Sequence, residues 1–354
     1  MVLIIDGYEV SSSLPVSQLH SKYQLLKANS LSVLSRPARQ VEASEKCLYV
    51  GQREVAVVAP GDNVNMVGSE DATTCHIVIL RDVHTGVTGL AHLDNEEPND
   101  FLTLEREVRD RVINKVSVSF CTYNFFRVRE VTRELDTLEY SVSIIGGYDD
   151  ENSTSEEITE MLITVMQGLK ARFILQLACT GLVNTVMKND VPWPRVYGGG
   201  VDVDTGEVFT AKFSYHGPDT DIRSLRLHSR GATLHNIYDP YAGKIVIKPF
   251  AYSVMPDAHL WLKKADSFIL KYCSTSPLVE PPDFCEHIRA NFRRMISDPK
   301  PMDTLFPGGR SRVYKRHEIT GQWILEMDDS SDARSKSAGD MKPWGANDFR
   351  MQFN

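Results

Sequence analysis

The sequence predicts one globular domain of the α+β class. A β-branched apolar run at residues 77–80 and alternating apolar and polar residues at 138–145 predict strands, and apolar residues at helical spacing predict helices, for example from residue 158 onward. The chain has 354 residues, of which 42% are hydrophobic, and can therefore bury a large core. Length alone permits either one large domain or two ordinary ones.

The first half of the chain predicts a helical segment followed mainly by strands. The expected elements are a loose helical pattern at 14–34, two short strands within 47–58, a strand at 77–80, a returning strand at 88–93, a charged helix ending near 115, and strands at 116–123 and 138–145. Polar residues at 82–86 indicate a turn between the second pair of strands. The polar stretch 130–136 is interpreted as an exposed loop.

The second half predicts both helices and strands. Ser153 to Glu156 resembles a capping box, and the helix after it should bury Ile158, Leu162, Val165, Met166 and Leu169. Strands are expected at 172–179, 196–203, 207–214 and 244–249, and helices at 257–272 and 282–297. The glycines at 198–200 lack the lysine of a phosphate-binding loop and predict a close backbone approach. Residues 328–354 have few apolar side chains, and we expect a disordered tail.

Cys75 and His92 are the first candidates for chemistry. A thiolate with a neighbouring imidazole is the minimum for nucleophilic catalysis by cysteine. A turn centred on residues 83 and 84 would pair Cys75 directly with His92, and such opposed residues have Cβ atoms roughly 4.5–5.5 Å apart. The alternative is that Cys75 is only a packing residue, since cysteine is among the most buried residue types.

Composition bounds the classes of partner. A formal net charge of -8 and a pI near 5.7 give no reason to expect a nucleic acid or an anionic membrane. Asp6 ends the first apolar run too early for a signal peptide, and no eighteen apolar residues follow one another. The six cysteines form no C-x-x-C pair, so we expect reduced thiols, no metal and no cofactor. We expect a monomer in the cytosol or nucleus.

The segment from Gly68 to Arg81 reads Gly-Ser-Glu-Asp-Ala-Thr-Thr-Cys-His-Ile-Val-Ile-Leu-Arg. It resembles the signature segment of the protein N-terminal asparagine amidohydrolase family of the eukaryotic N-degron pathway. Further similar blocks follow the family's order, at 48–57, 146–148, 197–198 and 274–289. The spacing of Cys75 and His92 is also similar to that of bacterial glutamine deamidases, namely the chemoreceptor deamidase and the cytotoxic necrotizing factors. In the chemoreceptor enzyme a hydroxyl residue six positions before the cysteine completes the triad, and Ser69 has that offset.

The resemblance implies a layered sandwich of mixed and antiparallel strands flanked by helices, in one catalytic domain spanning 1–327. It implies hydrolysis of the side-chain amide of a free amino-terminal asparagine in a protein or peptide, which yields aspartate and ammonia. Cys75 would be the nucleophile, His92 the acid and base, and Ser69 the residue that orients the imidazole. Asp94 remains an alternative orienting residue. Residues 95–137 are interpreted as an insertion, because this stretch is shorter in the family.

Substrate binding would need a partner for the protonated amine, and a carboxylate is the favoured one. Asp71 and Glu70 lie beside the nucleophile, although both could be solvated acids of a polar loop, Glu70 more so than Asp71. Backbone amides around Thr74 and Cys75 are candidates for stabilising an oxyanion. Ser276 is either a pocket residue or a helix cap.

Two other functional classes stay open. One is a thiol peptidase or transamidase, because an acyl thioester forms from many amides and is resolved by water or by an amine. The other is a non-catalytic module that binds peptide amino termini, in which Cys75 belongs to the core.

Overall fold

Buried apolar strands build a central sheet of eight strands in the computed structural model, which describes residues 2–10, 14–121, 138–229 and 233–326, without the side chains of 117–121. Its order is β15 (His235–Asn236), β5 (Glu54–Val58), β8 (Thr88–Leu93), β7 (His76–Asp82), β9 (Glu139–Ile145), β10 (Arg172–Cys179), β1 (Val2–Ile5) and β2 (Tyr8–Glu9). Strand β7 is antiparallel to β8 and β9, whereas β9, β10 and β1 are parallel. The mixed sheet confirms the predicted α+β class.

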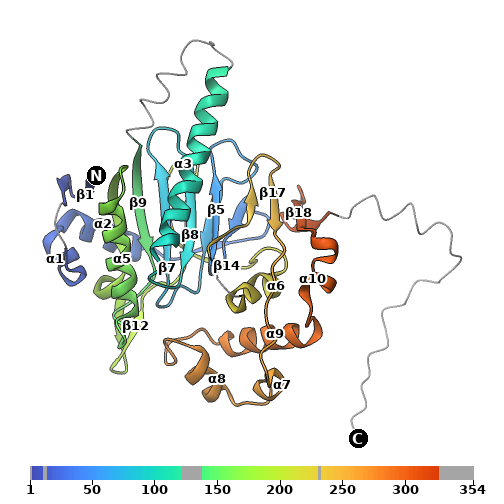
Figure 1. Cartoon of the computed structure of the whole chain (residues 1–354). Helices are drawn as coiled ribbons and strands as arrows, with labels where there is room; N and C mark the ends of the chain where they lie inside the picture. Colours follow the sequence, from blue (N-terminus) through green and yellow to red (C-terminus); the bar gives the residue numbers. More distant parts are fainter. Residues whose placement is uncertain (1, 11–13, 122–137, 230–232, 327–354) are drawn as a thin grey trace, which may run out of the picture.

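Helices α3 (Pro98–Cys121) and α5 (Thr154–Gly168) cover one face of this sheet (Figure 1). Their apolar stripes bury Phe101, Leu104 and Val108 of α3, and Ile158, Leu162 and Met166 of α5, in one cluster with Val78, Leu80 and Tyr140 of the sheet. The predicted buried side of the helix after residue 153 is therefore confirmed at these three positions. Next to them, η1 (Val16–Gln18), α1 (Leu19–Lys22) and α2 (Gln24–Leu34) confirm the expected helical segment.

A second sheet of five strands packs on the opposite face. Its order is β3 (Arg39–Val41), β14 (Val208–Phe213), β13 (Gly199–Asp202), β6 (Met66–Ser69) and β4 (Cys47–Tyr49). Val67 and Val201 of this sheet share a buried cluster with Ile77, Ile79 and Leu90 of the first. The sheets approach closely, because a Cβ added to Gly199 would lie 2.4 Å from Cδ1 of Ile145. The helix, sheet and sheet layers form the sandwich that the resemblance implied.

Smaller elements enclose the second core. They are η3 (Gly181–Asn184), β11 (Thr185–Lys188), β12 (Val191–Pro194), α6 (Thr220–Ser224), η4 (Leu225–His228), β16 (Tyr238–Asp239), β17 (Lys244–Ile247), α7 (Ala258–Trp261), α8 (Asp266–Cys273), α9 (Phe284–Ser297), α10 (Pro301–Thr304), η5 (Pro307–Gly309), β18 (Arg312–Arg316) and β19 (Trp323–Leu325). Strands β16, β17, β18 and β19 form a sheet of their own. The helix expected at 257–272 is interrupted, since α7 and α8 are separate. No helix in the described part of the chain is long and apolar enough to span a membrane.

Two local predictions were wrong. The strand expected at 116–123 continues helix α3 as far as Cys121, because each residue added to a helix already packed on a sheet gains a backbone hydrogen bond at small cost. The capping box also fails: Ser153 is left-handed with φ 59° and makes no side-chain cap. The carboxylate of Asp150 instead accepts hydrogen bonds from the backbone amides of Asn152, Thr154 and Ser155. The loop expected at 130–136 and the tail at 328–354 lie outside the described residues.

A buried ion cluster joins the first sheet to helix α6 and to η4. Glu54 begins β5 and accepts hydrogen bonds from the Nε of Arg223 at 2.9 Å and from Arg226 at 3.2 Å, and all three side chains are almost completely buried. Burial alone would raise the pKa of Glu54, but the two guanidinium groups lower it below the ordinary value. One carboxylate therefore compensates two buried cations.

Replacing Glu54 with Gln should destabilise the fold strongly, because two buried guanidinium groups would lose their counter-charge. We expect the free energy of unfolding to fall by about 3–5 kcal/mol, measured by urea denaturation followed by tryptophan fluorescence. Glu207→Gln is the matched control, since Glu207 pairs with Arg36 on the surface and both side chains are more than half exposed. Equal stability of the two variants would contradict the role of this cluster.

Candidate functional site

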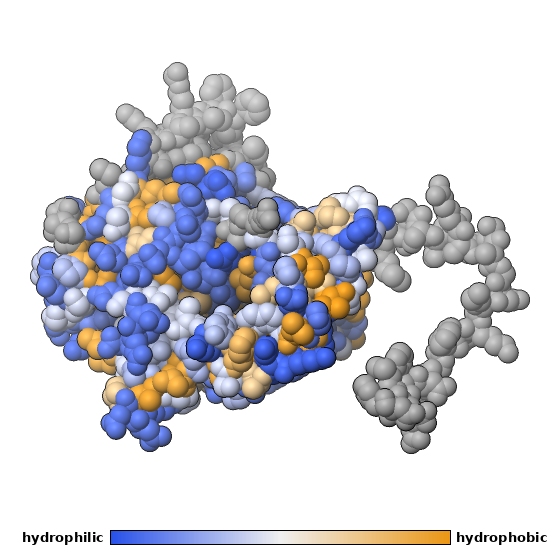
Figure 2. Space-filling model, turned by 60° about the horizontal axis from the view of Figure 1, so that its bottom comes forward, coloured by the Kyte–Doolittle hydropathy of each residue, from blue (hydrophilic) through white to orange (hydrophobic). Residues whose placement is uncertain are grey.

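Cys75 directly precedes β7, at the edge of the large sheet where β8 and β9 end. This edge is the lower end of the molecule in Figure 1, which also carries α8 and α9. Figure 2 turns that end forward and shows polar side chains interspersed with separate apolar patches. Residues from distant parts of the sequence thus meet around the cysteine.

The predicted register of the β7–β8 hairpin was wrong by two residues. His92 pairs with Ile77, not with Cys75, and the closing pair is Arg81 with Thr88. The turn is wider than expected, because β7 ends at Asp82, whose carboxylate accepts hydrogen bonds from the backbone amide and the hydroxyl of Thr85. A shift of two residues keeps the alternation of faces. Continuing the register makes Cys75 and His92 diagonal neighbours, a relation in which Cα atoms are roughly 7–8 Å apart.

Ser69 lies at the end of β6 in the second sheet, opposite His92 in the first. Its Oγ is 2.8 Å from Nδ1 of His92, and both residues are buried. Nε2 of His92 is buried and has no hydrogen-bond partner in the described chain. Burial lowers the pKa of His92 to about 4, although the carboxylates of Asp94 and Glu54 oppose this shift. The imidazole is therefore neutral at pH 7, with one nitrogen free to accept a proton.

Asp94, the alternative orienting residue, has other partners. Its carboxylate accepts hydrogen bonds from Nε of Arg53 at 2.8 Å and from Nε2 of Gln52 at 2.8 Å. No hydrogen bond joins it to His92 among the residues that the structure describes. The geometry therefore favours Ser69 as the residue that orients the imidazole.

The thiol of Cys75 lies in an environment that disfavours the thiolate. Burial raises its pKa first, and the carboxylates of Asp94 and Glu280 raise it further, while Arg53 and the hydroxyl of Thr74 lower it by less. The free site thus holds a neutral thiol beside a neutral imidazole. Thr74 itself is buried, and its hydroxyl is 2.9 Å from that of Thr275.

The loop before Cys75 presents unpaired backbone donors. Its path is held by bonds from the amide of Ala72 to the carbonyl of Tyr197 and from the amide of Gly147 to the carbonyl of Ala72. Gly146 is required there, since a Cβ at this left-handed position would lie 2.7 Å from the carbonyl oxygen of Cys75. Within the described ranges the amides of Thr74 and Cys75 donate to no acceptor. Such amides can stabilise a developing oxyanion.

The two acids beside the nucleophile differ in their surroundings. The carboxylate of Glu70 is already bonded within the protein, because it accepts a hydrogen bond from the backbone amide of Phe213 at 2.9 Å and lies 2.8 Å from Nε2 of His216. Asp71 has a left-handed backbone with φ 64° and makes no ion pair with another described residue. The protein atoms around Asp71 and the neighbouring Glu70 raise its pKa to about 6, although the residue itself is exposed at the surface. Asp71 is therefore the carboxylate available to a ligand.

The loop between α8 and α9 closes the other side of the site. The bond of Thr275 to Thr74 attaches it, and Ser276 is 4% exposed, with its hydroxyl interacting with that of Tyr148. Ser276 lies in a turn and caps no helix. Glu280 acts electrostatically on both Cys75 and Asp71. Sequence analysis did not single out Glu280, since no local pattern relates it to a residue 205 positions earlier.

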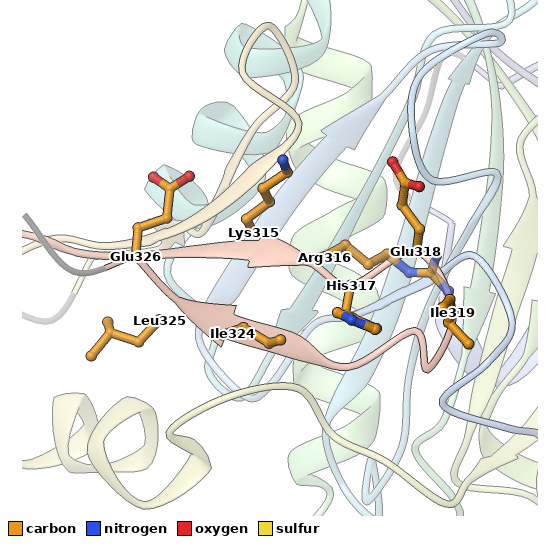
Figure 3. A pocket seen from close by; sticks show the side chains of 8 residues that line it. All are labelled: Lys315, Arg316, His317, Glu318, Ile319, Ile324, Leu325 and Glu326. Carbon is orange, nitrogen blue, oxygen red and sulfur yellow. The ribbon is translucent and has the colours of Figure 1, made fainter.

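A surface hollow lies elsewhere, along the hairpin of β18 and β19 (Figure 3). It is lined by Lys315, Arg316, His317, Glu318, Ile319, Ile324, Leu325 and Glu326. None of these residues belongs to the cysteine site, so the hollow is not assigned to its chemistry. No group of three or more His, Cys, Asp or Glu side chains in the described ranges is placed to hold a metal ion.

Comparisons with known proteins agree in one family. The family model described as protein N-terminal asparagine amidohydrolase matches residues 36–325. Proteins with that name from Sus scrofa and Homo sapiens are each 31% identical over 324 residues, which is 91% of this chain and 97% of the relative. The protein of that name from Arabidopsis thaliana is 26% identical over 79% of this chain and 81% of its own length.

The state of His92 can be tested by 15N NMR of the imidazole. We expect it to be neutral at pH 7 and to gain a proton only near pH 4, because burial disfavours the charged form. For Nε2 to stay free, the proton must be on Nδ1 and be donated to Ser69. Ser69→Ala should therefore shift the tautomer balance, whereas Asp94→Asn should leave it unchanged. The opposite result would assign the orienting role to Asp94.

Proposed function

From the finding that this chain belongs to the protein N-terminal asparagine amidohydrolase family, we propose that it deamidates amino-terminal asparagine through a thioester on Cys75. The observation that carries the proposal is the arrangement of Ser69, His92 and Cys75 at one edge of the sandwich, with Ser69 Oγ 2.8 Å from the imidazole. A cysteine, a base and a group that orients the base are the requirements for nucleophilic acyl transfer.

The proposed reaction has two displacement steps at the carboxamide carbon, the first by Cys75 and the second by water. Sγ of Cys75 attacks the carboxamide carbon while its proton passes to Nε2 of His92. The oxyanion of the tetrahedral intermediate receives hydrogen bonds from the amides of Thr74 and Cys75. The imidazolium then protonates the departing nitrogen, which leaves as ammonia. In the second displacement His92 removes a proton from water, which hydrolyses the thioester and releases the aspartate product with the thiol restored.

Recognition of a chain terminus is assigned to the acidic side of the site. The carboxylate of Asp71, which has no counter-charge within 4 Å in the described chain, is assigned the role of accepting the α-ammonium group. The buried hydroxyl of Ser276, which interacts with that of Tyr148, offers a further polar contact. Glu70 contributes indirectly, because its bonds to Phe213 and His216 position the loop that carries Asp71.

In a cell, this reaction would expose aspartate at the amino terminus of a protein. We propose that it thereby initiates degradation of Asn-started proteins by the N-degron pathway, in the cytosol and nucleus. The same triad could support peptide cleavage or transamidation, and the products distinguish these reactions. Deamidation leaves the length of the peptide unchanged and replaces NH2 by OH.

An ammonia assay with mass spectrometry on short peptides tests the proposal. A peptide beginning with Asn should release ammonia and gain about one dalton, as replacing NH2 by OH through a thioester requires. The peptide with acetyl-Asn should not react, because it lacks the ammonium group. Cys75→Ala should abolish turnover and keep the fold, as judged by circular dichroism. Shortening of the peptide would show a peptidase, and full activity of Cys75→Ala would exclude the thioester.

Activity should depend on pH in a bell-shaped manner. Asp71 has a pKa of about 6 and is ionised above it, so kcat/KM should fall as the pH decreases through about 6. The α-amino group of the substrate, with a pKa of roughly 7.7–8.0, loses its charge at higher pH, so kcat/KM should fall there too.

Asp71→Asn tests whether Asp71 causes the fall of kcat/KM at low pH, which we call the acid limb of the pH profile. The variant should lose the acid limb near pH 6. Its kcat/KM should be roughly 10- to 100-fold lower, mainly through a higher KM, since a hydrogen bond to a charged group is removed. Glu286→Gln is a control, because Glu286 is an exposed acid of helix α9 and pairs with Arg293 instead. Retention of the limb in Asp71→Asn would show that another group binds the amine.

A further inference from the structure

Asn184 is a completely buried amide that no step above uses. It is the last residue of η3 and is 0% exposed. Its Nδ2 donates hydrogen bonds to the carbonyl of Gly147 at 2.9 Å and to the carbonyl of Val196 at 2.8 Å. Its Oδ1 accepts a hydrogen bond from the backbone amide of Val196 at 3.1 Å. The side chain therefore joins two backbone segments that are far apart in the sequence.

Both of these segments hold the loop before the nucleophile. The carbonyl of Tyr197, the residue after Val196, accepts a hydrogen bond from the amide of Ala72 at 2.8 Å. The amide of Gly147 donates to the carbonyl of Ala72 at 3.4 Å. We call these two bonds the Ala72 clamp. Ala72 is 0% exposed, so water does not compete for either bond, and Asn184 joins the two arms of the clamp.

Two parts of the proposed chemistry lie within three residues of Ala72. Thr74 and Cys75 follow it, and their amides donate to no acceptor within the described ranges. Ser69 precedes it and pairs with Gly199 in the neighbouring strand β13. An oxyanion donor is effective only when it points to the position where the charge develops. The placement of Ala72 therefore decides whether the two amides that follow it can serve the reaction.

The position of Asn184 requires a side chain with two donors. Two carbonyl oxygens face Nδ2, and an asparagine amide supplies one N–H group to each. A carboxyl group of the same size has one O–H donor in the neutral form that burial favours, and alanine has none. The fold has a separate bond in this region, because the hydroxyl of Thr185 accepts the amide of Asp149 at 2.8 Å. Loss of the Asn184 amide should therefore loosen the clamp without unfolding the domain.

We propose that Asn184 is a positioning residue that joins the two arms of the Ala72 clamp and so fixes the direction of the oxyanion amides. The inference rests on the proposed function for the reaction that these amides serve. Asn184 acts through the backbone and does not touch the substrate. Its loss should therefore slow the step in which the oxyanion forms and leave the binding of the substrate nearly unchanged.

Steady-state kinetics on the Asn peptide test the positioning role. Asn184→Ala should lower kcat roughly 100-fold, since misplacing a catalytic group by about 1 Å costs that much. KM should change little, because Asp71 is also held through Glu70, whose carboxylate keeps its own bonds. Asn184→Asp keeps the volume and one donor, so its kcat should lie between those of the wild type and Asn184→Ala. If Asn184→Ala does not fold, Asn184→Asp decides the same comparison.

Asn291→Ala is the matched control for loss of a buried amide. Asn291 is 6% exposed, and its Oδ1 accepts the hydroxyl of Ser224 at 2.6 Å, a bond that joins α9 to α6. This variant should lose a comparable amount of stability in urea and keep the kcat of the wild type. An equal fall of kcat in both alanine variants would show a general effect of destabilisation and overturn the proposal. Wild-type kcat in the folded Asn184 variants would overturn it as well.

Amide hydrogen exchange, followed by NMR, tests the clamp without any substrate. The amides of Ala72 and Val203 each donate to a backbone carbonyl at 2.8 Å, and both residues are buried. In the Asn184 variants the amide of Ala72 should exchange roughly fivefold to tenfold faster, as the loss of one net hydrogen bond implies, and that of Val203 should keep its rate. Equal rates of change at the two amides would overturn the proposal. Absence of ammonia release by the wild type, with the selective acceleration at Ala72 present, would overturn the proposed function alone.

Discussion

The site depends on the close packing of two sheets at Ser69 and His92. The hydroxyl comes from β6 of the five-stranded sheet and the imidazole from β8 of the eight-stranded sheet, and the 2.8 Å bond between them crosses the sandwich. Glycine makes this approach possible, since a side chain at Gly199 would collide with Ile145. Sheets that pack face to face usually lie about 10 Å apart, so a short serine can reach across only where backbone replaces side chains on one face.

Local patterns predicted much of the fold around the site. Strand β8 spans the residues expected for the returning strand, and β7, β9 and β10 were each expected within two residues of their observed ends. The pairing of Cys75 with His92 was wrong, however, because register depends on the turn, and the carboxylate of Asp82 builds a wider turn than polarity alone indicates. The error was two residues, so the faces were still predicted correctly.

Local sequence patterns could not predict the remaining parts of the fold and of the site. Strand β1 was interpreted only as a short apolar run, since four residues show too little periodicity, yet it lies in the large sheet between β10 and the edge strand β2. Likewise, neither the carboxylate of Glu280 nor its relation to Cys75 follows from spacing across two hundred residues. The choice between Ser69 and Asp94 was also open, because it depended on where Arg53 places its guanidinium.

The charges of the site also bear on the product. The substrate side chain is a neutral amide, whereas hydrolysis creates a carboxylate, and the charges that act on Cys75 include the carboxylates of Asp94 and Glu280. Under the proposed mechanism, acidic residues at the site would repel the new carboxylate of the product, and burial would strengthen the repulsion, because charges interact more strongly where the dielectric is low. The reaction thus converts a ligand that suits the site into one that does not. Under the proposed roles, product release would gain from the charge that recognises the substrate, and a neutral resting thiol avoids adding a further anion to this cluster.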